Sequence, residues 1–247
     1  QEGVAVAMAD GYALATGRPA LVNLHAAAGT GNAMGNLTNT QSGHVPVVVT
    51  SGQQARRYVP LNAMLTNVDA PALAAPLVKW SHEPPRPQDV PQALSKGILL
   101  AAAAPAGPVY ISLPLDDWDF DADADALKHL TARVVHGDPV LSEQALGLLR
   151  DRLAAAADPV MIVGPGVDDE TGWDGATRLA ERLALPVMVA PSPSRCPFPT
   201  RHPNYRGVLP ADIPGLAGAV EGHDLVVAFG AAIFRYHAFI EGDYLPA

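Results

Sequence analysis

A carboxylate and an imidazole lie close to a run of small residues near the start of the chain. Glu2 opens an Ala-, Val- and Met-rich helical pattern, and His25 directly follows a short apolar strand pattern at residues 20–24. A glutamate can hold or move a proton, and an imidazole can donate one to a developing alkoxide. Both residues also have structural explanations, as a charge that complements a helix dipole and as a histidine with satisfied hydrogen bonds.

Small residues connect the strand pattern to a helix in the sequence HAAAGTGNAMG, residues 25–35. Bare Gly and Ala let a ligand approach the backbone closely, and a helix N-terminus offers free N–H groups. Gly29, Gly31 and Gly35 miss the G-x-G-x-x-G dinucleotide spacing by one residue. The segment therefore indicates either a loop that a cofactor approaches or a tight connection with close helix packing.

The second half of the chain has a weaker Gly-rich motif and two unusual segments. The turn Val-Gly-Pro-Gly at residues 163–166 lacks a third glycine and a later acidic partner, which favours a structural turn over a nucleotide site. The sequence SRCPFPTRHPNYRG at residues 194–207 predicts a shaped surface loop rather than core. The sequence FRYH at residues 234–237 also indicates a surface loop, with a strand end at a domain edge as the structural alternative. Cys196 has no evident base beside it, so we assign it no nucleophilic role.

Short β-branched runs alternate with Ala- and Leu-rich helical patterns along the whole chain. This rhythm predicts an α/β fold of mostly parallel sheets covered by helices, with strands buried on both faces. Ser142 predicts a helix N-cap ahead of an apolar stripe at Leu146, Leu149 and Leu153. We predict strands at residues 20–24, 45–50, 108–112, 160–163, 186–189 and 225–229, and helices at residues 2–16, 31–41, 90–104, 142–156, 175–184 and 214–221.

Composition excludes several classes of protein. The 247 residues carry 16 basic and 25 acidic side chains, for a formal net charge of −9, and 49% of them are hydrophobic. An acidic chain without a basic cluster is not expected to bind nucleic acid or an anionic membrane. The apolar runs are too short to cross a bilayer. A single cysteine excludes an intrachain disulfide and favours a reducing compartment.

An Asp-rich stretch at residues 116–138 lacks a strand-length apolar run, which predicts an interdomain linker. Its D-x-D spacing lacks the Gly and the distant Glu of a calcium loop, so we predict no metal site there. The domains predicted are residues 1–118 and 139–247, with a linker at residues 119–138. Because a helical pattern starts at once and no helix closes the chain, we expect further chain on both sides.

Several of these segments together resemble the thiamine-diphosphate-dependent 2-keto acid decarboxylases, and most closely the benzoylformate decarboxylases. The likeness extends over essentially the whole chain and implies two three-layer αβα domains. These are a partial N-terminal pyrimidine-binding domain at residues 1–118 and a Rossmann-like central domain at residues 139–247. The segments are QEGVAVAMADGYALATGRPALVNLHAAAGTGNAMG, SGQQARR, MLTNVDA, PLVKWSHEP, GPVYISLPLDDWD, CPFPTRHP and FRYH.

The resemblance also implies roles for individual residues. Glu2 matches the family glutamate that hydrogen-bonds the aminopyrimidine ring and promotes loss of the cofactor's C2 proton. His25 matches a histidine at the substrate carbonyl, and His237 matches a second one supplied by the central domain. The cofactors implied are thiamine diphosphate and Mg²⁺. Their diphosphate and metal ligands are expected in a third domain, because no Gly-Asp-Gly occurs in this sequence. The cofactor-binding positions within the chain are Glu2, Gly29, Thr30 and Gly31.

The activity implied is non-oxidative cleavage of an aromatic 2-keto acid, benzoylformate, to benzaldehyde and CO₂. The resemblance further implies a cytoplasmic enzyme of the mandelate pathway that forms a homo-oligomer, either a dimer or a homotetramer. The 247 residues alone are expected to be inactive. One alternative is a thiamine-diphosphate carboligase of the acetolactate synthase or benzaldehyde lyase kind, which shares Glu2 but needs no histidine pair. A second is a non-catalytic nucleotide-binding module, supported only by the two Gly-rich turns.

Overall fold

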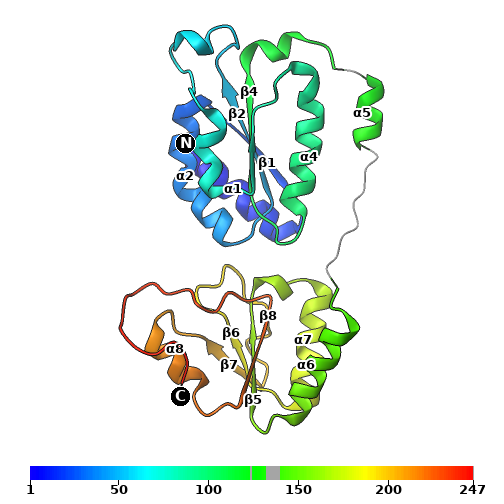
Figure 1. The fold of residues 1–247 in the computed structure, drawn as a ribbon, viewed down its shortest axis with the longest axis vertical. Coiled ribbons are helices and arrows are strands. Elements are labelled where there is room, and N and C mark those ends of the chain that lie inside the picture. The colour runs from blue at the N-terminus through cyan, green and yellow to red at the C-terminus, as the bar shows by residue number, and fades with distance from the viewer. Residues whose placement is uncertain (123, 132–139, 247) are drawn as a thin grey trace. The chain divides into compact units, whose positions relative to one another are not determined.

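Two units make up the chain in the computed structural model, which describes residues 1–122, 124–131 and 140–246. The units are Gln1–Pro139 and Val140–Ala247. Each has a four-stranded parallel sheet with helices on both faces, which confirms the predicted α/β fold (Figure 1). Part of the predicted linker, residues 123 and 132–138, lies outside the described residues. Its described part contains α5 (Ala124–Thr131), which packs against α4 (Val90–Ala102).

The sheet of the first unit has the strand order β1-β2-β4-β3. Helices α1, α2 and α3 cover one face and α4 covers the other. Side chains alternate between two cores, because Val47 and Val49 face α1 and α2 whereas Val48 faces α4. The strands are β1 (Ala20–Leu24), β2 (Val47–Gln53), β3 (Trp80–His82) and β4 (Val109–Pro114), and the other helices are α1 (Glu2–Thr16), α2 (Ala26–Ser42) and α3 (Ala70–Ala74).

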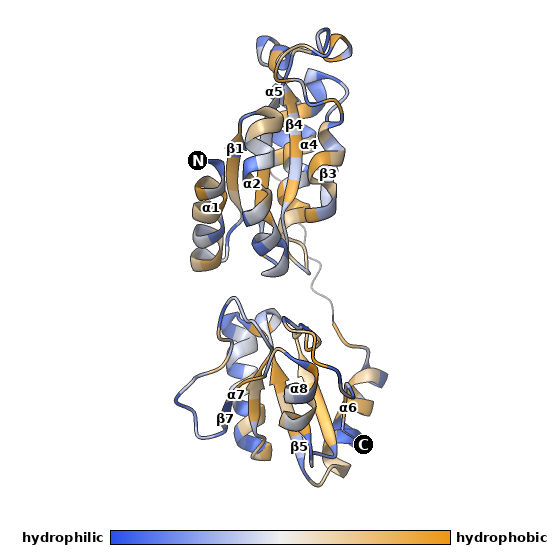
Figure 2. Ribbon diagram, turned by 90° about the vertical axis from the view of Figure 1, so that its left-hand side faces the viewer, coloured by the Kyte–Doolittle hydropathy of each residue, from blue (hydrophilic) through white to orange (hydrophobic). Residues whose placement is uncertain are grey.

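The sheet of the second unit has the order β7-β6-β5-β8 and is likewise apolar along its central strands (Figure 2). Met161 and Val163 pack toward α7, and Ile162 packs toward α8. The strands are β5 (Pro159–Val163), β6 (Val187–Val189), β7 (Tyr205–Val208) and β8 (Leu225–Phe229), and the helices are α6 (Glu143–Ala155), α7 (Glu170–Leu183) and α8 (Ile213–Val220). Short 3-10 turns lie at Val59–Leu61, Ala75–Leu77, Pro87–Asp89, Leu115–Asp119 and Pro165–Val167.

The predicted elements all form, with differences at their ends. The bounds of α1, β1 and β8 are those predicted, whereas α2 begins at Ala26 rather than residue 31 and α7 begins at Glu170 rather than residue 175. In α7 the N-cap is Asp169, whose carboxylate accepts from the N–H of Gly172 at 2.7 Å. The edge strands β3 and β7 were not predicted, because three or four residues are too few to show a period.

Three predictions about burial need correction or qualification. Burial on both faces holds for β4 but is wrong for β1, an edge strand in which Leu21 is 67% exposed. Residues 194–207 are not only a surface loop, because Phe198 is 1% exposed in the core beneath α7. Ser142 is the predicted N-cap and accepts from the N–H of Ala145, but the apolar stripe of α6 is not buried and Leu146 is 56% exposed. No described helix combines the length and apolar content of a membrane span.

An ion pair connects the loops that follow β2 and β4. Arg56 donates from Nε and Nη2 to the two carboxylate oxygens of Asp117, at 2.8 and 2.7 Å. Its Nη2 also donates to the carbonyl of Pro84, and its backbone N–H donates to Asp116. The Asp117 side chain is only 5% exposed, so the guanidinium of Arg56 compensates a negative charge that is largely removed from water.

Replacing Arg56 should therefore destabilise the first unit. Because a buried carboxylate would lose its partner, we expect Arg56→Gln to lower the free energy of unfolding by about 2 kcal/mol. The control is Arg86→Gln, which breaks an exposed pair with Asp89 and should have a much smaller effect. Urea denaturation followed by circular dichroism measures both values. Equal losses in the two variants would show that the Arg56 ion pair is not specially stabilising.

A second carboxylate, that of Asp10, lies partly buried where α1 packs on α2. Its Oδ1 is buried and has no hydrogen bond within the described residues, and its Oδ2 accepts only a long bond of 3.4 Å from Thr40. Burial raises the pKa of Asp10 above its ordinary value. The folded state therefore holds this proton more tightly than the unfolded state does.

The sign of the resulting pH dependence follows from that difference. Because the folded-state pKa is the higher one, stability present at low pH is lost as pH rises through it. We expect Asp10→Asn to raise the Tm at pH 7 and to have little effect at about pH 4 or below. Asp89→Asn should lower the Tm at pH 7, because the hydrogen bond from Arg86 lowers the pKa of Asp89. Thermal unfolding from pH 4 to 8 tests both, and a pH-independent effect of Asp10→Asn would contradict the argument.

Candidate functional site

Glu2 and His25 meet at Gly29. Glu2 lies in the first turn of α1, and His25 follows β1 directly as the N-cap residue of α2. A Cβ at position 29 would come within 3.2 Å of Cγ and Oε1 of Glu2 and within 3.3 Å of Cβ of His25. The glycine therefore leaves room for the Glu2 carboxylate beside the first turn of α2, where Cβ of His25 also lies. The structure thus groups three of the predicted site residues.

The Glu2 carboxylate is held in its ionised form. Its own backbone N–H and the side-chain amide of Asn32, which donates to Oε2 at 3.2 Å, lower the pKa of Glu2, and His25 adds a smaller effect. Asn32 was missed from the sequence, although a signal was present. His25, Gly29 and Asn32 are spaced i, i+4 and i+7, which places them on one helix face.

Buried hydroxyl groups tie the first turn of α2 to the neighbouring strand. The Thr30 Oγ1 lies 2.8 Å from the carbonyl of Ala26 and 3.0 Å from Oγ of Ser51, which itself donates to the Ala26 carbonyl at 3.0 Å. Thr30 is fully buried, so its hydroxyl supports the turn from within. Gly31 is exposed, and a Cβ there would contact nothing within 4 Å. Of the four predicted cofactor-binding residues, the structure brings together Glu2 and Gly29.

His237 lies in the second unit. It is exposed, its backbone N–H donates to the carbonyl of Ala211 at 2.8 Å, and its Nε2 lies 2.5 Å from Oγ of Ser192. The FRYH segment follows β8, which stops at Phe229, as irregular chain. This agrees with the predicted loop and not with the alternative of a strand end. Ser192 was also missed, since 45 residues separate it from His237.

The Gly-rich turn of the second unit is filled by the chain itself. A Cβ at Gly164 would come within 2.4 Å of the carbonyl oxygen of Gly230, and one at Gly166 within 2.7 Å of its Cα. Both glycines therefore permit backbone contact between the ends of β5 and β8, which confirms the structural turn. Gly29 is similarly in contact with Glu2 and His25. The turn at Gly164 and Gly166 therefore leaves no bare backbone for a nucleotide.

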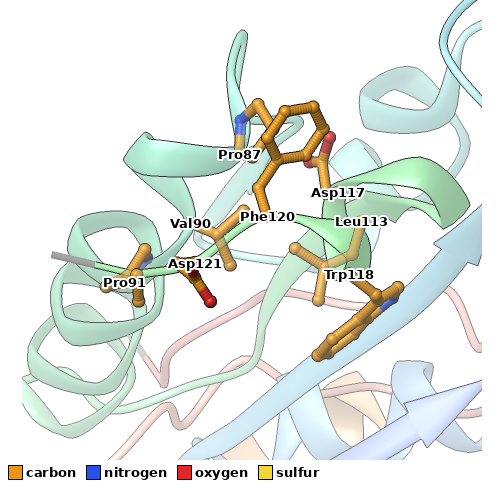
Figure 3. Close-up of a pocket in the computed structure, with 9 residues that line it drawn as sticks. Pro87, Val90, Pro91, Leu113, Asp117, Trp118, Phe120 and Asp121 are labelled. Atoms are coloured by element: carbon orange, nitrogen blue, oxygen red, sulfur yellow. The ribbon is translucent and has the colours of Figure 1, made fainter.

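An apolar pocket of about 240 Å³ lies elsewhere in the first unit, between the start of α4 and residues 117–122. In this pocket Leu113 lies between Phe120 and Trp118, and Val90 lies on the side of Pro91 and Asp121 (Figure 3). The pocket is also lined by Asp117, the carboxylate paired with Arg56. None of the predicted catalytic residues lines it. Among the described residues, no three His, Cys, Asp or Glu side chains gather as the ligands of a metal would.

Two family models match the chain. Residues 1–73 match the model "Thiamine pyrophosphate enzyme, N-terminal TPP binding domain", and residues 148–244 match "Thiamine pyrophosphate enzyme, central domain". Together they cover well over half of the chain, one in each unit.

Named relatives agree with these matches. The chain is 55% identical to a benzoylformate decarboxylase of Pseudomonas aeruginosa, over all of this chain and 46% of that protein. It is 30% identical to the acetolactate synthase isozyme 3 large subunit of Escherichia coli, over 93% of this chain and 40% of that protein. A solved structure, the thiamine diphosphate-dependent 4-hydroxybenzoylformate decarboxylase of Rhodococcus jostii RHA1, matches 99% of this chain and 46% of its own with a TM-score of 0.94 and 51% identity.

The chain thus spans less than half the length of these relatives. The expected resemblance is confirmed in both units, by sequence and by fold. This chain belongs to the thiamine pyrophosphate enzymes and contains their N-terminal TPP-binding and central domains.

Proposed function

We propose that the chain is part of a thiamine-diphosphate-dependent enzyme that cleaves benzoylformate to benzaldehyde and CO₂. The observation that carries the proposal is the approach of the ionised Glu2 carboxylate and His25 to Gly29. The substrate class is supported by the likeness to relatives named for benzoylformate and 4-hydroxybenzoylformate.

The residues around Gly29 fit the aminopyrimidine end of the cofactor. When bound, thiamine diphosphate supplies a nucleophilic carbon and an electron sink for decarboxylation. The carboxylate of Glu2 is a partly exposed hydrogen-bond acceptor that is oriented by Asn32. It can accept a hydrogen bond from a protonated nitrogen of the cofactor's ring, and the missing side chain at Gly29 leaves room for the carboxylate. Thr30 supports this turn through its buried hydroxyl.

The two histidines are assigned to the substrate. His25 and His237 are both exposed at the surface of their units, and an imidazole there can donate a proton to the substrate's oxygen and later return one to carbon. A carboligase would use the same carboxylate at Glu2. Because this chain is also similar to an acetolactate synthase, carboligase activity is the alternative to be tested.

The remaining assignments follow from the family. Residues 1–118 are assigned to the pyrimidine-binding domain, residues 119–138 to a linker and residues 139–247 to the central domain. Magnesium and the diphosphate would be bound by a further domain of the longer protein, which we propose to be a cytoplasmic homotetramer acting in the mandelate pathway. The free cysteine, Cys196, agrees with a reducing compartment.

Replacing Glu2 tests the cofactor-binding role. In the full-length enzyme, Glu2→Gln should slow C2 proton exchange of bound thiamine diphosphate by roughly 10²- to 10⁴-fold, because an amide cannot take up the proton. Hydrogen–deuterium exchange followed by NMR measures the rate. The control is Glu143→Gln, which removes the exposed first-turn carboxylate of α6. If both variants exchanged like wild type, Glu2 would be only a helix-end charge.

Substrate preference tests the activity. With Mg²⁺ and thiamine diphosphate, the full-length enzyme should favour benzoylformate over pyruvate by about 100-fold in kcat/KM, because an apolar pocket gains more from a phenyl ring than from a methyl group. Benzaldehyde and CO₂ should be the products. Preference for pyruvate with release of acetolactate would identify the carboligase instead.

A further inference from the structure

The chain contains a serine–histidine pair that the family assignment does not explain. We propose that Ser192 is a positioning residue for His237, whose hydroxyl holds the imidazole in the tautomer with its proton on Nδ1. The inference rests on the proposed function, in which His237 acts on the substrate, and it specifies which atom of His237 does so.

The contact joins two loops that are distant in sequence. Ser192 follows β6 and His237 follows β8, and these loops meet through Oγ of Ser192 and Nε2 of His237 at 2.5 Å. The backbone N–H of His237 donates to the carbonyl of Ala211, so the histidine is fixed through its backbone as well as through one ring nitrogen. Within the described part of the chain, Nδ1 of His237 has no hydrogen bond.

Of the two possible directions of this hydrogen bond, the proposed one has the Ser192 hydroxyl as the donor. A serine hydroxyl has one hydrogen to donate, and a neutral imidazole has one N–H donor and one acceptor nitrogen. Within the described residues, Nε2 is the only acceptor in reach of the Ser192 hydroxyl. With the hydroxyl as donor to Nε2, the ring proton lies on Nδ1, the nitrogen without a protein partner among the described residues. The opposite arrangement, in which Nε2–H donates to the hydroxyl oxygen, is the outcome that the NMR experiment below distinguishes. The exposed nitrogen is the one that can donate to a substrate oxygen.

The backbone gives a second, independent indication that the side chain of Ser192 matters. Ser192 has φ 51°, in the left-handed region that disfavours residues with a Cβ, and it precedes Pro193, which further disfavours helical conformations. Glycine would adopt this conformation without strain. A serine held in a strained conformation so that its hydroxyl meets a candidate catalytic histidine is typical of a functional site.

NMR of the intact 247-residue chain tests the tautomer without measuring activity. With ¹⁵N-labelled histidine, and with His237→Gln used to assign the resonances, wild-type His237 should be mainly the Nδ1–H tautomer at pH 8. Ser192→Ala and Ser192→Gly should both shift it toward Nε2–H, while the His25 resonances stay unchanged. A wild-type Nε2–H tautomer, or no change in the variants, would overturn the proposal.

The two variants also separate the hydroxyl from the backbone. Ser192→Gly relieves the strain and Ser192→Ala keeps it, so a purely structural serine predicts a more stable and fully active glycine variant. We expect instead that both lower kcat of the full-length enzyme by about tenfold or more with little change in KM. Full activity in either variant would overturn the positioning role. An inactive wild-type enzyme would contradict the proposed function but not the tautomer measured in the chain.

Discussion

The close contact between the first turns of α1 and α2 is the constraint on which the candidate site depends. Glu2 is at the start of one helix and His25 precedes the other, and they can approach because position 29 has no side chain. A Cβ at position 29 would lie 3.2 Å from the carboxylate, so the Glu2 side chain would have to shift by a few tenths of an ångström. Helix geometry then adds Asn32 to the same face, where its amide orients the carboxylate and favours its ionised form.

This contact holds because the start of α2 is fixed from the opposite side. Ala26 has φ 45°, a strained conformation for a residue with a Cβ, and its carbonyl accepts from the buried hydroxyls of Thr30 and Ser51. Ser51 belongs to β2, the strand paired with β1. These hydroxyl groups therefore fix the turn that follows His25 against strand β2. The two hydroxyls and the Ala26 carbonyl satisfy one another's hydrogen bonds, while the backbone of Ala26 is strained.

Local sequence patterns predicted the helices and strands better than they predicted the contacts between those elements. The bounds of α1 were evident because Gly17 is a left-handed C-cap and Pro19 follows it. In contrast, the buried side chain of Gln53 bonds both the N–H and the carbonyl of Asn67, and no local pattern marks such a pair. Glu2 and His25 gained their roles from resemblance, and Asn32 follows from helical spacing. The Ser192 contact with His237 depends on which loops the sheet brings together, so only the fold could reveal it.

The Glu2 carboxylate and the His237 imidazole differ in their hydrogen-bond partners, and this difference supports different proposed roles. Glu2 receives hydrogen bonds from a backbone N–H and from Asn32, which stabilise its charged form and suit it to act as a hydrogen-bond acceptor. His237 has a protein partner on one ring nitrogen only, so its other nitrogen is available to donate and to recover a proton. The Glu2 carboxylate can therefore polarise a group that donates to it, whereas the His237 imidazole can transfer a proton through its open nitrogen. These properties support the proposed roles of the carboxylate toward the cofactor and of the imidazole toward the substrate.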